Sequence, residues 1–287
     1  MKLSVIIPCY NAAPYIATQL EALARQQWSE PWEVIVADNG STDDSRAIVE
    51  RYRGRLPNLR VVDASDKRGA AHASNVGALA AAGEALAFCD ADDEVGEGWL
   101  AAMGAGLARH DFIACRYAAD RLNPAWVQAI HRVPQRDGLQ VYDEPPYLPH
   151  AGGSSLGVKR SVHLAVGGFD ESLMQLQDTD YCWRIQLSGT ELHFCPEALV
   201  HIRYRHTLGG IFRQAAGYAE YNVLLYKRYR ARGMPELSWK SALPEWLYVL
   251  RLVPGLRSRR DVARWLWQLG WRIGRLRGSL KHRVLAP

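Results

Sequence analysis

Three carboxylates follow an apolar run in the first third of the chain. The run 86–89 leads into Asp90-Ala91-Asp92-Asp93, so three acids lie within four residues. Carboxylates this close repel one another unless a cation or a donor-rich ligand lies among them. The segment predicts a divalent metal ion that bridges a phosphate, and a solvated acidic turn is the alternative.

Two other polar segments follow predicted strands nearer the N-terminus. Pro8-Cys9-Tyr10-Asn11 follows the apolar run 3–7, and Asp38-Asn39-Gly40-Ser41 follows the run 34–37. The carboxyl ends of parallel strands share one edge of a sheet, so these segments and the acid cluster would line one crevice. The combination is typical of a nucleoside diphosphate site, although each segment alone also fits an ordinary turn.

Short apolar runs alternate with helix-like stretches over the first hundred residues, which predicts βαβ units. We expect strands at residues 3–7, 34–37, 59–62 and 86–89, and helices at 15–27, 45–52 and 71–82. Residues 112–160 contain loop signals at Pro145-Pro146 and Gly152-Gly153 and show no clear pattern. The predicted fold class is α/β, with a Rossmann-like, mostly parallel sheet flanked by helices.

Charge is distributed unevenly along the chain. Residues 227–287 carry 15 Lys and Arg against three acids, a net charge of +12, whereas residues 1–226 carry 20 basic and 27 acidic side chains. We therefore expect a domain at 1–226, with a nucleotide-binding half at 1–110 and an acceptor-side half at 111–226, and a basic helical extension at 227–287. No helix-turn-helix, zinc or RNP pattern accompanies the positive charge, so no nucleic-acid partner is expected.

The five cysteines form no C-x-x-C pair, which predicts reduced thiols and a cytoplasmic chain. Met1-Lys2 leads directly into a short strand that stops at Pro8, and no apolar run is long enough to cross a bilayer. Neither secretion nor membrane spanning is expected.

The basic extension contains an amphipathic helix, predicted at residues 261–281. Its apolar face carries Val262, Trp265, Leu266, Leu269, Ile273, Leu276 and Leu280, and its polar face carries Arg264, Gln268, Arg275 and Ser279. Tryptophan and arginine beside an apolar face are typical of helices at a bilayer interface, so residues 261–283 are expected to bind an anionic membrane surface. Gly270, Gly274 and Gly278 share one side, which fits the alternative that the helix packs on this chain or on a second copy in a homodimer.

From Leu3 to about His201, the ordered set of motifs resembles the family 2 inverting glycosyltransferases, which have the GT-A fold and use nucleotide-sugar donors. The resemblance implies that Pro8, Tyr10 and Asp38 hold the nucleobase and ribose, with Asn11 in the same segment. Asp90 and Asp92 match the D-x-D motif, which places Asp92 on Mg²⁺ or Mn²⁺ and Asp90 near the ribose.

The segment 66–77 resembles the loop and helix start that many members write with Ala-Arg-Asn. Asn75 and Gly77 match the pattern, whereas Ser74 replaces the usual arginine. The resemblance therefore implies a diphosphate contact that is missing or is supplied by Lys67 or Arg68.

On the acceptor side, Gly167–Glu171 followed by Gln177–Tyr181 resembles the family segment that carries the catalytic carboxylate. Gln177 replaces the usual glutamate, which leaves Asp178 as the candidate base; a helix N-terminal acid is the alternative. Asp180 is spaced for an i,i+4 ion pair with Arg184.

Two further positions acquire a role through the resemblance. His201 falls where many relatives place a metal-binding histidine, and a structural histidine is the alternative. Gly153 and Ser154 lie in a segment similar to the turn beneath the acceptor sugar, and a plain loop is the alternative.

The resemblance implies an inverting, metal-dependent transferase that uses a nucleotide-diphosphate sugar and a hydroxyl acceptor. The charge and the amphipathic helix of the extension add the expectation of a glycan or lipid-linked acceptor and of a peripheral location at the inner face of the plasma membrane. A haloacid dehalogenase-type phosphohydrolase is disfavoured because Glu94 stands where it needs Thr or Val. A sugar-nucleotide pyrophosphorylase is disfavoured because residues 7–11 lack glycine and lysine. A degenerate domain that binds nucleotide or a partner without turnover remains open, because Gln177 and Ser74 depart from the family pattern.

Overall fold

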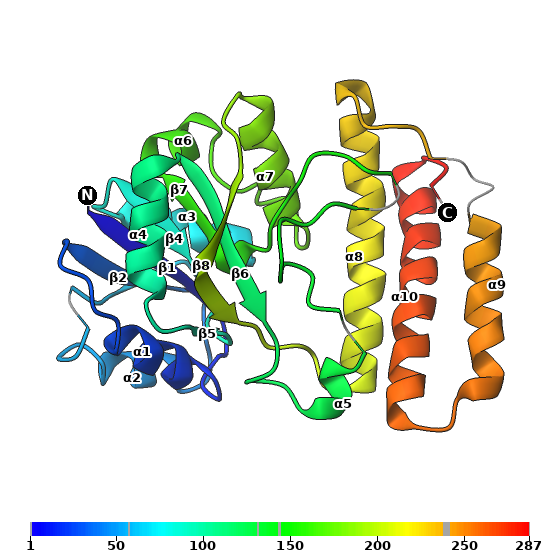
Figure 1. Cartoon of the computed structure of the whole chain (residues 1–287), viewed down its shortest axis with the longest axis horizontal. Helices are drawn as coiled ribbons and strands as arrows, with labels where there is room; N and C mark the ends of the chain where they lie inside the picture. The colour runs from blue at the N-terminus through cyan, green and yellow to red at the C-terminus, as the bar shows by residue number, and fades with distance from the viewer. Residues whose placement is uncertain (1, 57, 131, 143–144, 238–241, 287) are drawn as a thin grey trace. The chain divides into compact units, whose positions relative to one another are not determined.

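The computed structural model describes residues 2–56, 58–130, 132–142, 145–237 and 242–286. Its internal contacts divide the chain into two compact units (Figure 1). Unit 1 comprises residues 1–122, 133–140 and 149–203, and unit 2 comprises residues 123–132, 141–148 and 204–287. The expected boundary between residues 226 and 227 lies inside helix α8 (Leu208–Tyr229), which belongs to unit 2.

Unit 1 is built on an eight-stranded sheet with the order β3-β2-β1-β4-β7-β6-β8-β5. Its strands are β1 (Leu3–Cys9), β2 (Trp32–Asp38), β3 (Arg60–Asp63), β4 (Ala85–Phe88), β5 (Glu94–Val95), β6 (Phe112–Ala118), β7 (Leu156–Lys159) and β8 (His193–His201). β1, β2, β3 and β4 pair in parallel, and β7 is antiparallel to both β4 and β6. The α/β fold and the four strands expected before residue 90 are confirmed.

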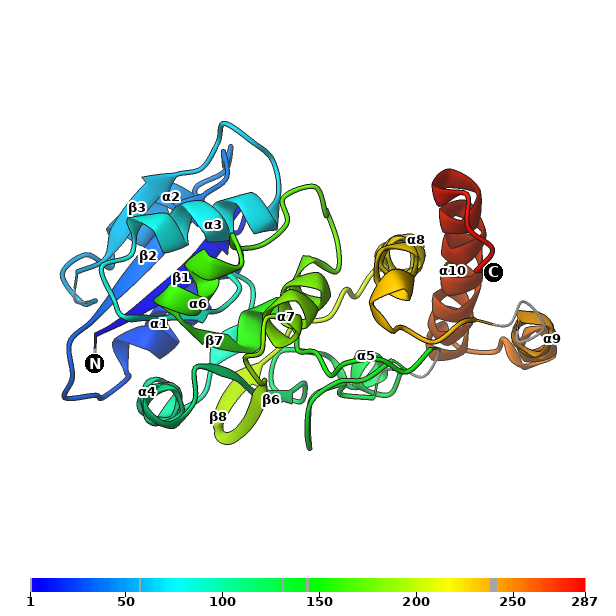
Figure 2. The same cartoon turned by 90° about the horizontal axis from the view of Figure 1, so that it is seen from above.

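Helices cover both faces of this sheet (Figure 2). They are α1 (Ile16–Ala24), α2 (Ser45–Glu50), α3 (Ala70–Ala80), α4 (Trp99–Arg109), α6 (Arg160–Ala165) and α7 (Gln177–Leu187). α3 packs on β1 and β2, and α4 packs on β6 and β8. Every residue of β2 and β4 is buried, which explains the apolar sequence of β4 and the apolar run 34–37 within β2.

The core beneath α3, α6 and α7 is aromatic. Phe169 stacks on Tyr181 with ring centroids 4.2 Å apart, and Phe88 meets Phe169 edge-on at 5.1 Å. The Tyr181 hydroxyl shares a 2.8 Å hydrogen bond with His163 Nδ1. These contacts fix the loop that precedes α7, the helix that carries Asp178.

All five cysteines are free and buried, as expected for reduced thiols. Burial, followed by the charge of Asp38, raises the pKa of Cys9 to about 11, and burial raises that of Cys115 to about 12.

Unit 2 consists of α5 (Ala125–Gln128), α8, the turn η2 (Arg230–Arg232), α9 (Ala242–Leu252), the turn η4 (Val253–Gly255) and α10 (Arg259–His282). α10 begins with a capping box, in which Asp261 N–H donates to Ser258 Oγ and Ser258 N–H donates to Asp261 Oδ2 at 3.0 Å. α10 lies between α8 and α9 and packs on both (Figures 1 and 2). Within the described segments, no helix combines the length and hydropathy that a membrane crossing requires.

The surface that α10 presents to α8 differs from the predicted apolar face. Arg275, expected on the polar face, is buried and donates to Asn222 Oδ1 of α8 at 2.7 Å. Leu276 and Leu280, expected on the apolar face, are 40% and 81% exposed. The predicted face is therefore wrong over the second half of α10.

Glycines explain this choice of face. A Cβ at Gly270 would lie 2.7 Å from the carbonyl oxygen of Phe212. A Cβ at Gly274 would overlap the carbonyl oxygen of Ala216. The two helix backbones approach more closely than leucine side chains would allow, and dense packing compensates for the missing apolar atoms.

Replacing Gly274 with alanine is expected to lower the free energy of unfolding by about 3 kcal/mol, because the new methyl group must separate α8 from α10. Urea unfolding monitored by tryptophan fluorescence measures this change. Gly255→Ala is the control, because no atom lies within 4 Å of a Cβ at that position. Equal stability of the two variants would contradict the close contact.

Candidate active site

The carboxyl ends of β1 and β2 lie side by side at one edge of the sheet, where Cys9 is the register partner of Asp38. Asp38 is buried, and its Oδ1 accepts a hydrogen bond from Ser41 N–H at 3.2 Å. Asn11 joins the two loops, because its N–H donates to Ser41 Oγ at 3.0 Å and its side-chain oxygen accepts from Thr42 N–H at 2.8 Å. Asn11 adopts a left-handed backbone with a φ of 47°.

An aromatic ring and an arginine lie together next to this edge. Pro8 is half-buried in β1 opposite Ala37, whereas the Tyr10 side chain is 48% exposed. The guanidinium carbon of Arg68 lies 5.8 Å from the centroid of the Tyr10 ring. A planar base and a phosphate group are chemically suited to such a pair.

Asp93 is the buried member of the acid cluster. Burial, followed by the charges of Asp90 and Asp92, raises the pKa of Asp93 well above its usual range. Arg203 N–H donates to Asp93 Oδ1 at 2.8 Å, and Arg203 Nε donates to the carbonyl oxygen of Asp92 at 2.9 Å. The mutual repulsion of these carboxylates fits a divalent cation, which prefers oxygen ligands.

His201 ends β8 and is the register partner of Glu94 in β5. Its Nδ1 lies 3.7 Å from a carboxylate oxygen of Asp120. Burial, followed by the charge of Arg121, lowers the pKa of His201, so the imidazole is neutral at pH 7, the form that binds metals. Among the residues that the structure describes, no group of three or more His, Cys, Asp or Glu side chains is arranged to hold an ion, so a cation at Asp92 would also need ligands from phosphate or water.

Asp178 lies in the first turn of α7 and accepts two backbone hydrogen bonds. Its Oδ1 accepts from Thr179 N–H at 2.8 Å, and its Oδ2 accepts from Gly153 N–H at 3.0 Å. Burial nevertheless raises the pKa of Asp178 above its ordinary value. A carboxylate with a raised pKa is a stronger proton acceptor than an exposed aspartate.

Gly153 and Ser154 connect Asp178 with the acid cluster. They begin the turn η1 (Gly153–Ser155), which packs against β4 and β6. The Ser154 hydroxyl lies 2.9 Å from that of Tyr117, and its hydrogen bond to Asp93 lowers the pKa of that carboxyl against the larger effect of burial. The structure thus joins Asp178 to Asp93 through two consecutive residues.

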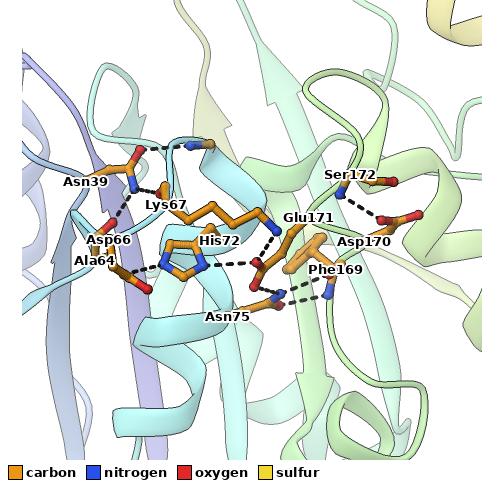
Figure 3. A network of polar contacts seen from close by, with 11 residues as sticks. Asn39, Ala64, Asp66, Lys67, His72, Asn75, Phe169, Asp170, Glu171 and Ser172 are labelled. Atoms are coloured by element: carbon orange, nitrogen blue, oxygen red, sulfur yellow. Dashed lines mark hydrogen bonds and ion pairs between the residues drawn. The ribbon is translucent and has the colours of Figure 1, made fainter.

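Lys67 and Asn75 belong to a polar network around Glu171 (Figure 3). Lys67 Nζ lies 2.8 Å from Glu171 Oε2, and His72 Nδ1 lies 3.1 Å from the same oxygen. Asn75 Nδ2 donates to Glu171 Oε1 at 3.0 Å and to Phe169 O at 2.9 Å, and Phe169 N–H donates to Asn75 Oδ1 at 2.8 Å. A ligand contact by Lys67 would therefore require its ammonium group to leave or share Glu171.

The network stabilises the ionised form of Glu171 and the protonated form of His72. Burial disfavours ionisation of Glu171, but hydrogen bonds from Asn75, Lys67 and His72 outweigh it and lower the pKa to about 2. Burial also disfavours protonation of His72, but hydrogen bonds with Asp66, at 2.8 Å, and Glu171 raise its pKa.

Replacing His72 with glutamine is expected to lower the free energy of unfolding by about 1–2 kcal/mol at pH 6, the magnitude of a charge-assisted hydrogen bond. The folded-state pKa of His72 is raised, so this stabilisation is complete below the unfolded value of about 6.5 and is lost as the pH rises through the folded value. Urea unfolding at pH 6 and pH 9 should show the loss only at pH 6.

His206→Gln is the matched control, because His206 is exposed. An equal loss of unfolding free energy at both pH values in the His72 variant would contradict the stabilising role of protonated His72 between Asp66 and Glu171.

The sequence predicts no individual role for Arg203, His72 or Glu171, and it predicts Asp93 only as one member of the acid cluster. Asp93 and Glu171 lie within motifs already singled out, and Arg203 follows His201 by two residues. The Asp180 to Arg184 ion pair is present at 2.7 Å, as predicted.

Comparison with known proteins identifies the family. The model of glycosyl transferase family 2 matches residues 4–166, more than half of the chain. The chain belongs to glycosyl transferase family 2. This confirms the family inferred from the motifs.

Curated glycosyltransferases match this chain over limited regions. Glycosyltransferase AglE of Haloferax volcanii is 35% identical over 197 residues, which cover 68% of this chain and 65% of AglE. The uncharacterized glycosyltransferase YibD of Escherichia coli is 44% identical over 94 residues, 33% of this chain and 27% of YibD. The matches therefore span less than two thirds of each relative.

Solved structures share the GT-A fold. The mannosyltransferase PcManGT of Pyrobaculum calidifontis, in complex with GDP-Man and Mn²⁺, has a TM-score of 0.62 at 20% identity and covers 97% of this chain and 75% of its own. Staphylococcus aureus TarS 1-349, in complex with UDP-GlcNAc, has a TM-score of 0.55 at 19% identity and covers 99% and 93%.

Proposed function

We propose that this chain is an inverting glycosyltransferase that moves a sugar from a nucleoside diphosphate donor to a hydroxyl group of a glycan or lipid-linked acceptor. One observation carries the proposal: Asp178 accepts a hydrogen bond from Gly153, and Ser154, the next residue, bonds to Asp93 of the acid cluster. These contacts would connect the base to the site of the charged leaving group, as a single displacement at one carbon requires.

The strand edge would bind the donor nucleotide. Tyr10 and Pro8 would contact the base, and Asp38 and Asp90 would bind the ribose. Arg68, 5.8 Å from the Tyr10 ring centroid, would contact the diphosphate together with Lys67. Asn11 and Asn75 would position these loops, because both side chains bond to neighbouring backbone.

Asp92, assisted by His201, would hold Mg²⁺ or Mn²⁺, which when bound neutralises charge on the departing diphosphate. The neutral imidazole of His201 and the crowded carboxylates are compatible with that role. PcManGT forms a complex with GDP-Man and Mn²⁺, and TarS forms one with UDP-GlcNAc, which supports a nucleotide-sugar donor and a divalent cation here.

Asp178 would take the proton of the acceptor hydroxyl as that oxygen attacks the anomeric carbon. Gly153 carries no side chain beside this carboxylate, where a Cβ would lie 3.7 Å from Asp178 Cβ. Attack from the face opposite the leaving diphosphate inverts the anomeric configuration.

We further propose that the chain acts in the cytoplasm at the inner face of the plasma membrane, where lipid-linked acceptors are accessible. The net charge of +12 over residues 227–287 supports attraction to anionic lipid.

The direct test is release of nucleoside diphosphate from a panel of UDP and GDP sugars with Mg²⁺ or Mn²⁺, in the presence of glycan and lipid-linked acceptors. Turnover that stops on chelation, with a product of inverted configuration by NMR, is the expected result. Tight diphosphate binding without turnover of any donor and acceptor pair would instead favour a degenerate domain.

A further inference from the structure

Helix α9 carries a row of exposed leucines. Leu243, Leu247 and Leu250 are 66%, 43% and 63% exposed, and Val253 in the following turn η4 is 46% exposed. The leucines are spaced i, i+4 and i+7, so they form one stripe along the helix. Three large apolar side chains on one exposed face indicate an interaction surface.

α9 contacts α10 through the face opposite the leucine row. Trp265 Nε1 donates to the carbonyl oxygen of Val249 at 3.2 Å, and Arg264 donates to the Tyr248 hydroxyl at 2.7 Å. Val249 is buried, and successive helix positions are about 100° apart, so Tyr248 and Val249 point away from the leucine row. Within the described segments, packing of α9 on α10 therefore leaves the leucine row uncovered.

The α9–α10 hairpin that carries this row also carries exposed positive charge. Arg251, Arg257 and Arg260 are exposed. The acids of the α9–α10 hairpin are already engaged, because Glu245 lies 3.6 Å from Arg272 and Asp261 belongs to the capping box of α10. An apolar stripe on a hairpin that also carries exposed arginines suits a lipid bilayer, which is apolar inside and, with acidic lipids, anionic at its surface.

We propose that the leucine row of α9, flanked by Arg251, Arg257 and Arg260, docks on an anionic phospholipid bilayer. The helix lies along the membrane surface, with the leucines among the acyl chains and the arginines at the headgroups. A second copy of the chain is a poorer partner for this face, because the arginines of two copies would oppose one another. This surface differs from the one predicted from the sequence, since α10 lies between α8 and α9 and packs on both.

Co-sedimentation of the full chain with vesicles tests the proposal without any donor or acceptor, so its outcome is independent of the proposed transfer activity. The wild-type chain is expected to bind phosphatidylglycerol-containing vesicles at least tenfold more tightly than phosphatidylcholine vesicles at low salt, and to lose most of this preference in 0.5 M salt. Leu247→Ser/Leu250→Ser should lower the partition coefficient at least tenfold, and Arg257→Glu/Arg260→Glu should abolish the preference for anionic lipid.

The matched control is Leu79→Ser/Leu164→Ser, which changes two leucines of unit 1 that are 66% and 47% exposed. It should bind vesicles as the wild type does, and the circular dichroism of all variants should be unchanged. Wild-type vesicle binding by the α9 leucine variant would overturn the proposal. Light scattering that shows a dimer lost in that variant, with vesicle binding intact, would overturn it in favour of a contact between copies.

Discussion

Asp178→Asn is expected to lower kcat about a thousandfold while leaving donor binding unchanged, because general-base catalysis contributes about 10²–10⁴ in rate. Asparagine keeps the shape of the side chain, and its oxygen can still accept the 3.0 Å hydrogen bond from Gly153 N–H. The acceptor hydroxyl, however, would lose its proton acceptor. Nucleoside diphosphate release under saturating donor measures kcat, and calorimetry measures donor affinity.

The pH profile adds a second readout for this base. Burial raises the pKa of Asp178 above 3.8, and only the ionised carboxylate accepts a proton, so the acidic limb of kcat/KM should lie above that value. The control Asp111→Asn changes an exposed aspartate and should leave the rate and the profile unchanged. Near-wild-type kcat in the Asp178 variant would remove this residue from the chemistry.

Asp92→Asn is expected to lower activity by about 10²–10³ and to raise the Mn²⁺ concentration needed for half-maximal activity, because an amide binds a hard cation more weakly than a carboxylate. Metal titrations of activity and of diphosphate binding measure both effects. The variant should retain its fold, since the contact of Arg203 Nε with residue 92 uses the backbone carbonyl.

Folding of the Asp92 variant can be checked by its unfolding midpoint. Loss of one negative charge should also lower the pKa of Asp93 toward its usual range, because the Asp92 charge helps to raise it. Full activity with an unchanged metal requirement would exclude Asp92 as the metal ligand.

The strands of unit 1 could be predicted because their burial leaves a direct record in the sequence. β4 is buried throughout and appears as an apolar run, and so does the segment 34–37 of β2, which the buried Glu33 precedes and Asp38 follows. Polar residues begin where these strands approach the sheet edge, so the sequence alone predicts that Asp38 and Asp90 lie at that edge.

The packing of α10 could not be predicted in the same way. Apolar periodicity assigns a helix face from the hydrophobicity of its side chains, but Gly270 and Gly274 contribute through the absence of a side chain. The buried Arg275 depends on Asn222, which is 53 residues away. Likewise, Lys67 pairs with Glu171, which is 104 residues away in the sequence. The motif around Lys67 therefore predicts a positive side chain but not the carboxylate that pairs with it.

The cysteines offer a practical route to the α9 surface. All five thiols are buried, and burial raises the pKa of each, so the reactive thiolate is scarce at neutral pH. A cysteine introduced at Leu247 would be the one accessible thiol and would accept a maleimide dye without removal of the native residues. The emission colour of an environment-sensitive dye at that site would then report whether α9 leaves water when vesicles are added.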